Sequence, residues 1–270
     1  LDTSSKFAWT QVSPKPGSRS ETSLARYEVH YLLQDGGGSM WVKLDGKRVA
    51  TVSTDIGSKM ARANALSSGS KVGVLRLELE PGQAHVLRMG AKGDGPLRLL
   101  GVVAETDTPG VVLDTLGVIG AKATNMMVWD ERLWSEHLQT RTPDLVMMAF
   151  GNNEAADEDE PIEDYEAGYR KVLQRFEKVA PEASCVIMGP GDFPKRIRPD
   201  GTEAKHGDTE FTLEPRPRLA EIEGVQRKLA LEFGCAYLDP VSILGGEGAK
   251  HVWVEAGLGK DDYLHLTRQG

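Results

Sequence analysis

The chain has 270 residues, of which 40% are hydrophobic and 27% are charged, and its formal net charge is −8. This composition is typical of a soluble globular protein and excludes a disordered chain. The negative charge and the lack of a Lys/Arg-rich block argue against a nucleic-acid partner and against an anionic membrane surface, and no apolar run approaches the ~20 residues that span a bilayer.

Residues up to about 107 alternate between apolar and polar side chains, with turn signals between the runs, as in an antiparallel β protein. Strands are expected at 26–33, 40–44, 48–54, 72–80, 85–89 and 97–105. Asp45-Gly46 signals a two-residue hairpin, because its primed turn needs positive φ. Six short strands and no convincing helix predict a β-sandwich, jelly-roll-like, over 1–109.

Two tryptophans of this half, Trp9 and Trp41, are candidates for stacking on sugar rings. Large aromatic side chains contribute strongly to the packing of a sandwich core. Core packing is therefore the role that we favour for both.

From about residue 110 the pattern changes to alternating strands and helices. Val111–Leu113 leads through glycines into a helix rich in Met and Trp, and the apolar run 144–150 predicts a parallel strand buried on both faces. A helix opens at Pro161, and another covers 219–233 and stops at Gly234. Strands are expected at 185–188 and 236–238. The alternation predicts an α/β domain over 110–270.

The two cysteines, Cys185 and Cys235, follow no metal-binding or redox spacing. Each lies in or beside an apolar strand. We therefore expect two buried free thiols, which leave the cell compartment open.

Three segments at predicted strand ends carry residues suited to chemistry, and strand ends are where function collects in open α/β sheets. They are the glycine loop with Gly117 and Gly120, the segment Gly151-Asn-Asn-Glu154, and Asp262-Tyr-Leu-His265. Taken singly, each has a structural explanation: a turn glycine, an asparagine cap, and a surface Asp–His pair.

In this order, the three segments resemble the conserved blocks of SGNH (GDSL) hydrolases. The resemblance covers about residues 110–270 and implies a three-layer α/β fold, with a parallel sheet flanked by helices. It implies that His265 is the general base and that Asp262 orients its ring. The backbone N–H of Gly120, a better match than Gly117, and the amide of Asn153 would stabilise the oxyanion. Glu154 is expected to buttress its loop.

One block of that family is missing, because the sequence contains no Gly-Asp-Ser. The nearest substitutes lie in the wrong places: Gly93-Asp94-Gly95, Gly191-Asp192-Phe193 and Gly207-Asp208-Thr209. In one subgroup, the peptidoglycan O-acetylesterases, a carbohydrate-binding-like sandwich separates the serine block from the glycine block. Resemblance to this subgroup implies that the nucleophilic serine lies upstream of Leu1, on a segment that also supplies the first strand of the sheet.

The resemblance thus implies a serine-type carbohydrate O-acetyl esterase of bacterial cell-wall peptidoglycan, periplasmic or secreted. Its partners would be an acetylated carbohydrate and its own N-terminal segment. An O-acetyltransferase on the same scaffold, and a carbohydrate-binding protein with an inactive hydrolase domain, stay open. No cofactor or metal ion is expected. The acidic run 157–160 precedes a helix, where its charges favour the helix dipole rather than a cation.

Overall fold

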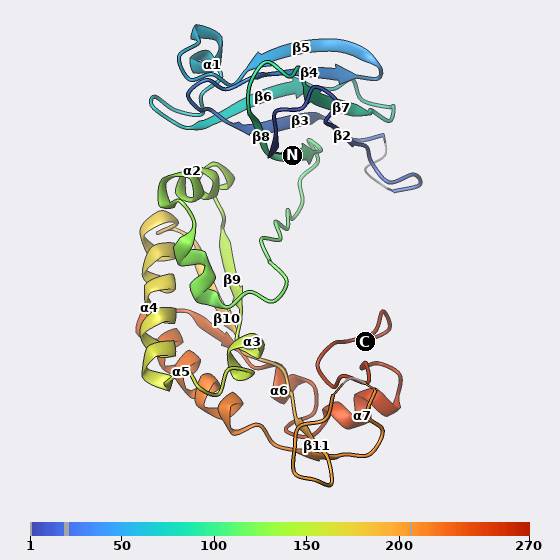
Figure 1. Ribbon diagram of the computed structural model, residues 1–270, viewed down its shortest axis with the longest axis vertical. Coiled ribbons are helices and arrows are strands. Elements are labelled where there is room, and N and C mark those ends of the chain that lie inside the picture. The colour runs from blue at the N-terminus through green and yellow to red at the C-terminus, as the bar shows by residue number, and fades with distance from the viewer. Residues whose placement is uncertain (1, 19–21, 206) are drawn as a thin grey trace. The chain divides into compact units, whose positions relative to one another are not determined.

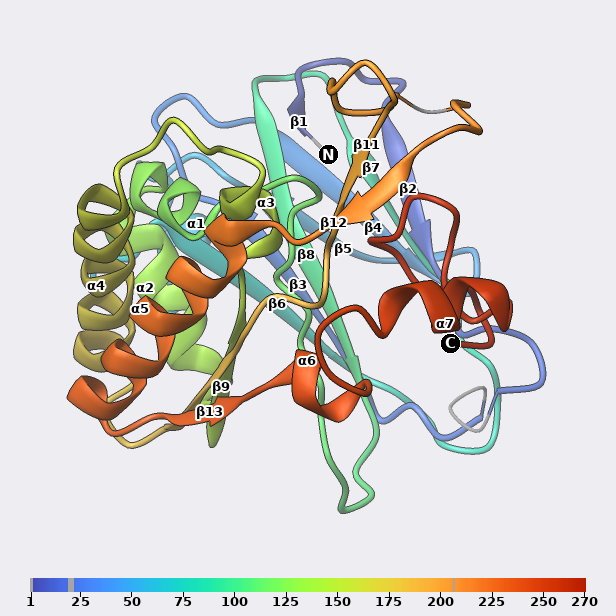
Figure 2. The same ribbon diagram turned by 90° about the horizontal axis from the view of Figure 1, so that it is seen from below.

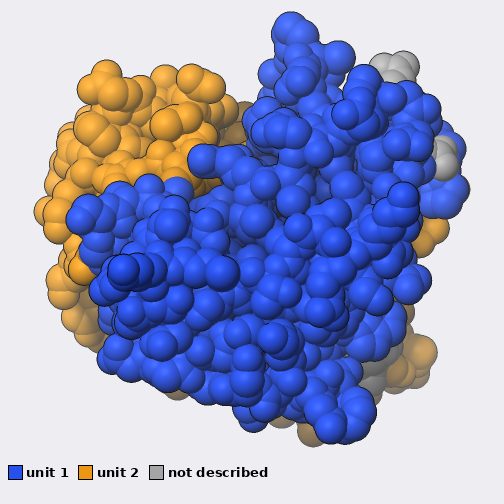
Figure 3. Space-filling view, turned by 90° about the horizontal axis from the view of Figure 1, so that it is seen from above, with its two compact units in different colours: residues 1–114 blue, residues 115–270 orange. Residues whose placement is uncertain are grey.

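The computed structural model describes residues 2–18, 22–205 and 207–270, so Leu1 lies outside the described part. The chain forms two compact units, Leu1–Asp114 and Thr115–Gly270, which Figure 3 shows in two colours. Each unit has its own hydrophobic core. The sequence pattern, by comparison, changes between residues 109 and 110. No helix in the described ranges is long and apolar enough to cross a membrane.

Unit 1 is built from two antiparallel sheets of four strands each within the described residues (Figure 1). One has the order β1-β8-β3-β6 and the other β2-β7-β4-β5. The strands are β1 (Asp2–Thr3), β2 (Trp9–Val12), β3 (Arg26–Leu32), β4 (Ser39–Leu44), β5 (Lys47–Ser53), β6 (Val72–Glu78), β7 (Leu87–Ala91) and β8 (Leu97–Glu105), with one short helix, α1 (Lys59–Ala63). Alternate side chains point inward, so Tyr27, Met40 and Leu87 are fully buried.

The six strands predicted for this half are all present, displaced at their ends by no more than a few residues. Asp45 and Gly46 have φ values of 50° and 80°, and Leu44 pairs with Lys47 across them, so the two-residue hairpin is confirmed. β1, β2 and α1 were not predicted, because each is too short to show a period.

The expected core role of the two tryptophans is wrong. Trp9 is 58% exposed, and Trp41 is partly exposed on β4 between the inward-pointing Met40 and Val42. The alternation of the strand places Met40 and Val42 in the core and therefore turns Trp41 to the outer face of the sheet.

Unit 2 contains a parallel sheet of the order β13-β10-β9, made of β9 (Leu145–Ala149), β10 (Ser184–Met188) and β13 (Ala236–Leu238). Two long helices, α4 (Ile162–Val179) and α5 (Pro217–Phe233), pack together beside it (Figures 1 and 2). The apolar stripe of α4 contributes Tyr165, Tyr169 and Val172 to a core that also includes Ile187 of β10.

The other elements of unit 2 are short. They are the 3₁₀-helix η1 (Ala123–Val128), α2 (Glu131–Arg141), α3 (Asn152–Ala155), the hairpin of β11 (Lys195–Ile197) and β12 (Thr212–Glu214), α6 (Pro240–Ile243) and α7 (Lys250–Glu255). Strand and helix alternate as the sequence predicts, so the α/β class is confirmed.

Two local predictions for unit 2 are wrong. β9 is not buried on both faces: Met148 points into the core at 2% exposure, but Leu145 and Met147 are 52% and 53% exposed. α4 and α5 contribute to the core that Met148 joins, and the side chains of the opposite face remain accessible. Val111–Leu113 forms no strand, and residues 110–119 are exposed and without regular structure.

The prediction of two free thiols is also wrong, because Cys185 and Cys235 form a disulfide. Cys185 lies on β10, and Cys235 directly precedes β13. The two strands are parallel neighbours, so residues 50 positions apart in the sequence meet at a Cα–Cα distance of 4.8 Å. Strand pairing creates this proximity, and sequence spacing does not reveal it.

Candidate active site

Asp262 and His265 form a hydrogen-bonded pair in the segment after α7. Nδ1 of His265 lies 2.8 Å from Oδ2 of Asp262, and the backbone N–H groups of Leu264 and His265 both donate to Oδ1 at 2.9 Å. Tyr263 has a φ of 60°, in the left-handed region that few non-glycine residues adopt. The turn through Tyr263 thus brings the two predicted side chains into contact.

The carboxylate of Asp262 is held in its ionised form. Partial burial raises its pKa, but the hydrogen bonds from His265 and Leu264 outweigh burial and lower the pKa to about 2. An ionised carboxylate only accepts hydrogen bonds, so Nδ1 of His265 carries the hydrogen of this contact, and in the neutral imidazole Nε2 is then the nitrogen with the lone pair. The side chain of His265 is 64% exposed, and Nε2 is therefore available as a proton acceptor.

Lys250, the first residue of α7, is buried and binds the backbone of the segment that carries Asp262 and His265. It is 5% exposed, and its Nζ donates to the carbonyl of Leu264 at 2.9 Å. Its backbone N–H donates to Oδ2 of Asp192 at 3.0 Å, which ties the C-terminal segment to the loop after β10. Burial lowers the pKa of Lys250, while Asp262 and Asp192 oppose that shift. Sequence reasoning missed this role, because an isolated lysine is usually exposed.

Asn153 lies in α3, directly after β9, beside the loop of Gly120. Its Nδ2 donates to the carbonyl of Ala121 at 2.9 Å. A side-chain amide has two hydrogens on that nitrogen, so one remains for another acceptor. Gly120 has a φ of 74°, and no atom lies within 4 Å of a Cβ built there. Backbone conformation, rather than close packing within the protein, is therefore what favours glycine at this position.

Glu154 joins the two loops, as its expected buttressing role requires. It is 2% exposed, and its Oε1 accepts from the backbone N–H of Ala123 at 2.8 Å. Its Oε2 accepts from the backbone N–H of Gly151 at 2.9 Å. One buried carboxylate thus fixes the end of β9 against the segment after Gly120.

The acidic run 157–160 adds a second connection to the same segment. Nζ of Lys122 contacts the carboxylates of Asp157 and Glu160, and Glu158 pairs with Lys195 and Arg216. The hydrogen bond from Lys122 and its charge lower the pKa of Asp157. The helix dipole alone does not explain the placement of these carboxylates, since Lys122, Lys195 and Arg216 pair with three of them.

The structure brings the predicted site residues together as two pairs, Asp262 with His265 and Asn153 with the loop of Gly120. Among the residues it describes, no hydrogen bond or ion pair joins one pair to the other. The aspartates of the three Gly-Asp segments are occupied by loop hydrogen bonds, Asp94 to Ser39, Asp192 to Lys250 and Asp208 to Lys205. One pair thus leaves Nε2 of His265 exposed, and the other leaves one Nδ2 hydrogen of Asn153 unused, and both are groups of the kind that acyl transfer employs.

Comparison with known proteins adds a family and a fold. Residues 89–270, which include all of unit 2, match the GDSL-like Lipase/Acylhydrolase family. No curated protein matches the chain significantly. A solved structure of a peptidoglycan O-acetylesterase superposes with a TM-score of 0.61 at 16% identity, covering 96% of this chain and 71% of that one. At this identity the likeness concerns the fold.

Two further solved structures are similar at lower TM-scores. A putative GDSL-like lipase from Parabacteroides merdae has a TM-score of 0.36 at 20% identity, and the match covers 55% of this chain and 62% of that one. A family two carbohydrate esterase from Cellvibrio japonicus has a TM-score of 0.28 at 12% identity, and the match covers 86% of this chain and 78% of that one.

Proposed function

This chain belongs to the GDSL-like lipase/acylhydrolase family, a family of ester hydrolases, and we propose that it is a serine-type O-acetyl esterase acting on an acetylated glycan, with cell-wall peptidoglycan as the substrate. The observation that carries the proposal is the pair of Asp262 and His265, with Nδ1 bound to the carboxylate and Nε2 free to accept a proton. This is the arrangement that a nucleophilic hydroxyl needs from its base.

In the proposed reaction, Nε2 of His265 takes the proton of a serine hydroxyl as its oxygen attacks the acetyl carbonyl. The negative charge that forms on the carbonyl oxygen receives hydrogen bonds from the backbone N–H of Gly120 and the free Nδ2 hydrogen of Asn153. His265 then returns the proton to the sugar oxygen, which leaves as an alcohol. Water then attacks the acetyl group on the serine, with His265 again acting as the base, and acetate is released. Asp262 stabilises the imidazolium of His265 in both steps.

We place the serine upstream of Leu1, on a strand that pairs with the open edge of β9. Two features support this placement. Among the residues that the structure describes, β9 is the last strand of the order β13-β10-β9, and Leu145 and Met147 on it are about half exposed. An unpaired edge with apolar side chains is a site for strand addition.

The proposed location is the periplasm or the cell exterior. The disulfide between Cys185 and Cys235 supports it, because such bonds persist mainly in oxidising compartments.

The test is acetate release from O-acetylated peptidoglycan and from a small acetyl ester. It compares the 270-residue chain with a longer chain that carries an upstream Gly-Asp-Ser segment. The longer chain should be active and the 270-residue chain inactive. His265→Ala in the longer chain should abolish release, whereas His251→Ala, which alters an exposed histidine on α7, should leave the rate unchanged.

The possible results separate the alternatives. Acetyl transfer to an added sugar in place of acetate release would identify an O-acetyltransferase. A longer chain that binds glycan but releases no acetate would overturn catalysis and leave a carbohydrate-binding protein. Activity of the 270-residue chain itself would refute an upstream serine.

A further inference from the structure

The outer face of the β2-β7-β4-β5 sheet in unit 1 carries a row of aromatic side chains. Trp9 on β2 pairs with Gly90 on β7, which in turn pairs with Trp41 on β4. Side chains at paired positions lie on the same face, so the two indoles flank a glycine on the outer surface. Trp9 is 58% exposed there.

Gly90 lets the indole of Trp41 lie against the sheet. A Cβ at position 90 would stand 2.5 Å from Cζ2 and 2.7 Å from Cε2 of Trp41, and 2.8 Å from the carbonyl oxygen of Ala8. Any other residue would therefore push the ring away. The indole covers the strand as a platform held by the fold, which lowers the entropy cost of binding a flat ligand.

A second row, two residues along each strand and therefore on the same face, is polar and cationic. Gln11 pairs with Arg88, Arg88 with Lys43, and Lys43 with Arg48. The guanidinium of Arg88 lies 5.8 Å from the ring centre of Trp9, and Nζ of Lys43 lies 5.5 Å from that of Trp41. Each indole thus has a cation beside it, and Nε of Arg88 is oriented by Oε1 of Gln11 at 2.6 Å.

The four strands of this sheet contain Lys43, Lys47, Arg48 and Arg88, but no aspartate or glutamate. Within the described part of the chain, no carboxylate forms an ion pair with these four cations. This concentration of positive charge stands out in a protein whose net charge is −8.

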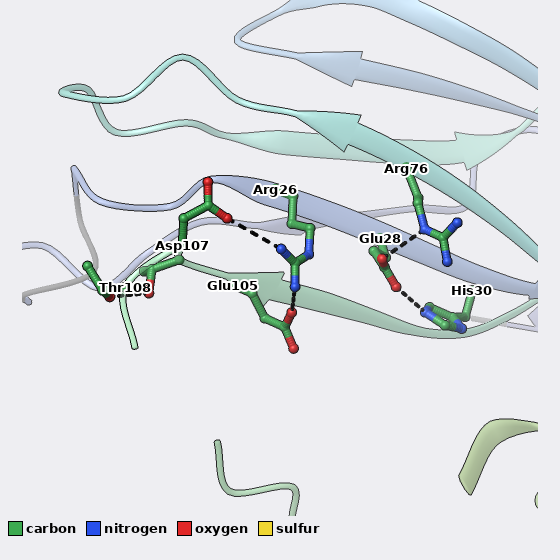
Figure 4. Close-up of polar contacts among 8 residues, drawn as sticks. Arg26, Glu28, His30, Arg76, Glu105, Asp107 and Thr108 are labelled. Atoms are coloured by element: carbon green, nitrogen blue, oxygen red, sulfur yellow. Dashed lines mark hydrogen bonds and ion pairs between the residues drawn. The ribbon is translucent and has the colours of Figure 1, made fainter. Parts of the chain in front are cut away.

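The opposite sheet of the same sandwich shows the contrast, because two of its arginines form ion pairs with carboxylates. Arg26 pairs with Glu105 and Asp107, and Arg76 pairs with Glu28 (Figure 4). Sandwich geometry alone therefore does not produce unpaired cations, and the cations of the β2-β7-β4-β5 face are open to an external anion.

We propose that this face is a binding site for glycans that carry carboxylate groups. Trp41, and Trp9 beside it, stack on the apolar face of a sugar ring, while Lys43, Arg88 and Arg48 pair with sugar carboxylates. The site lies on unit 1 and shares no residue with the proposed ester-cleaving site. It therefore stands whether or not unit 2 hydrolyses esters.

The experiment measures binding of the 270-residue chain to polygalacturonate and to its fully methyl-esterified form by isothermal titration calorimetry. The free acid should bind at least about tenfold more tightly than the ester, and rising salt should weaken its binding. Trp41→Ala should weaken both ligands by about tenfold, while Trp41→Phe should keep most of the affinity.

The charge variant is Lys43→Gln with Arg88→Gln, matched by Lys71→Gln, an exposed lysine outside this sheet. The double variant should lose the preference for the free acid, and Lys71→Gln should keep it. Thermal unfolding checks that each variant is folded. Equal affinity for acid and ester, no effect of Trp41→Ala in a folded protein, or tighter binding to single-stranded DNA than to the polyuronate would each overturn the proposal.

Discussion

The two carboxylates of the candidate active site work through backbone hydrogen bonds, but in different surroundings. Asp262 is partly exposed and accepts from Leu264 and His265, whereas Glu154 is buried and accepts from two separate loops. The contribution of Asp262 to stability should therefore depend on pH, whereas Glu154 should stabilise the fold mainly by joining the two loops.

Replacing Asp262 by Asn should reduce the loss of stability in acid. The folded-state pKa of Asp262 is lowered from 3.8 to about 2. The ionised carboxylate thus stabilises the fold above about pH 4, and the contribution disappears as the pH falls through 2. The free energy of unfolding, measured with urea from pH 6 to pH 2, should decline less steeply for Asp262→Asn than for the wild type. Parallel curves would contradict the assignment.

Replacing Glu154 by Gln should destabilise the chain by about 1–3 kcal/mol, because one buried backbone N–H would then face an NH₂ group. Chemical denaturation measures this loss. Glu163→Gln, at an exposed position in the first turn of α4, is the control and should change the free energy of unfolding very little. A loss as small as that of the control would mean that Glu154 does not join the loops.

At the scale of elements, the parallel sheet decides where the residues of unit 2 meet. Register places Val186 of β10 between Met147 of β9 and Ala236 of β13. Because α3 follows β9 and the loop of Asp192 follows β10, both lie in one region of the unit. The disulfide links β10 to the residue before β13.

Removing that disulfide with Cys185→Ala and Cys235→Ala together should lower the free energy of unfolding by about 2–4 kcal/mol, since the bond closes a loop with a sequence separation of 50. Urea unfolding with and without dithiothreitol provides the measurement. The reductant should bring the wild type towards the double variant and leave the variant unchanged. A wild type insensitive to reductant under unfolding conditions would argue that the bond is absent.

At the scale of the whole molecule, two separately cored units are joined through an exposed segment. Residues 110–119 have no regular structure, and their apolar members include Val111, Leu113 and Ile119, at 99%, 86% and 104% exposure. Such a segment has little structure to lose when a protease binds it.

Thermolysin, which cleaves before aliphatic side chains, should therefore cut first within 110–119 and leave two resistant fragments. Mass spectrometry of a brief digest locates the cut. The polar stretch of sequence 199–210 serves as an internal control, because its only aliphatic side chain is one alanine. First cuts inside β-strands of unit 1 would show that the two units are not separately stable.

The sequence by itself determined the two fold classes and the four candidate site residues. Strand alternation and the helical stripe of α4 are local patterns, and they predicted β3 to β8, α4 and β13 within a few residues. Gly120, Asn153, Asp262 and His265 were implied by the resemblance of short motifs, in a fixed order, to those of SGNH hydrolases, and the pairing of Asp262 with His265 needs only a local turn. Their catalytic roles stay predictions.

Only the tertiary structure decided which distant residues touch and which faces are covered. It joined Cys185 to Cys235, buried Lys250 against Asp192, and turned Trp9 and Trp41 outward. Each outcome depends on strand pairing or on what packs against a face, and residue spacing along the chain encodes neither. An alternating strand specifies that one face is buried, but the partners that arrive from elsewhere in the chain decide what each face meets.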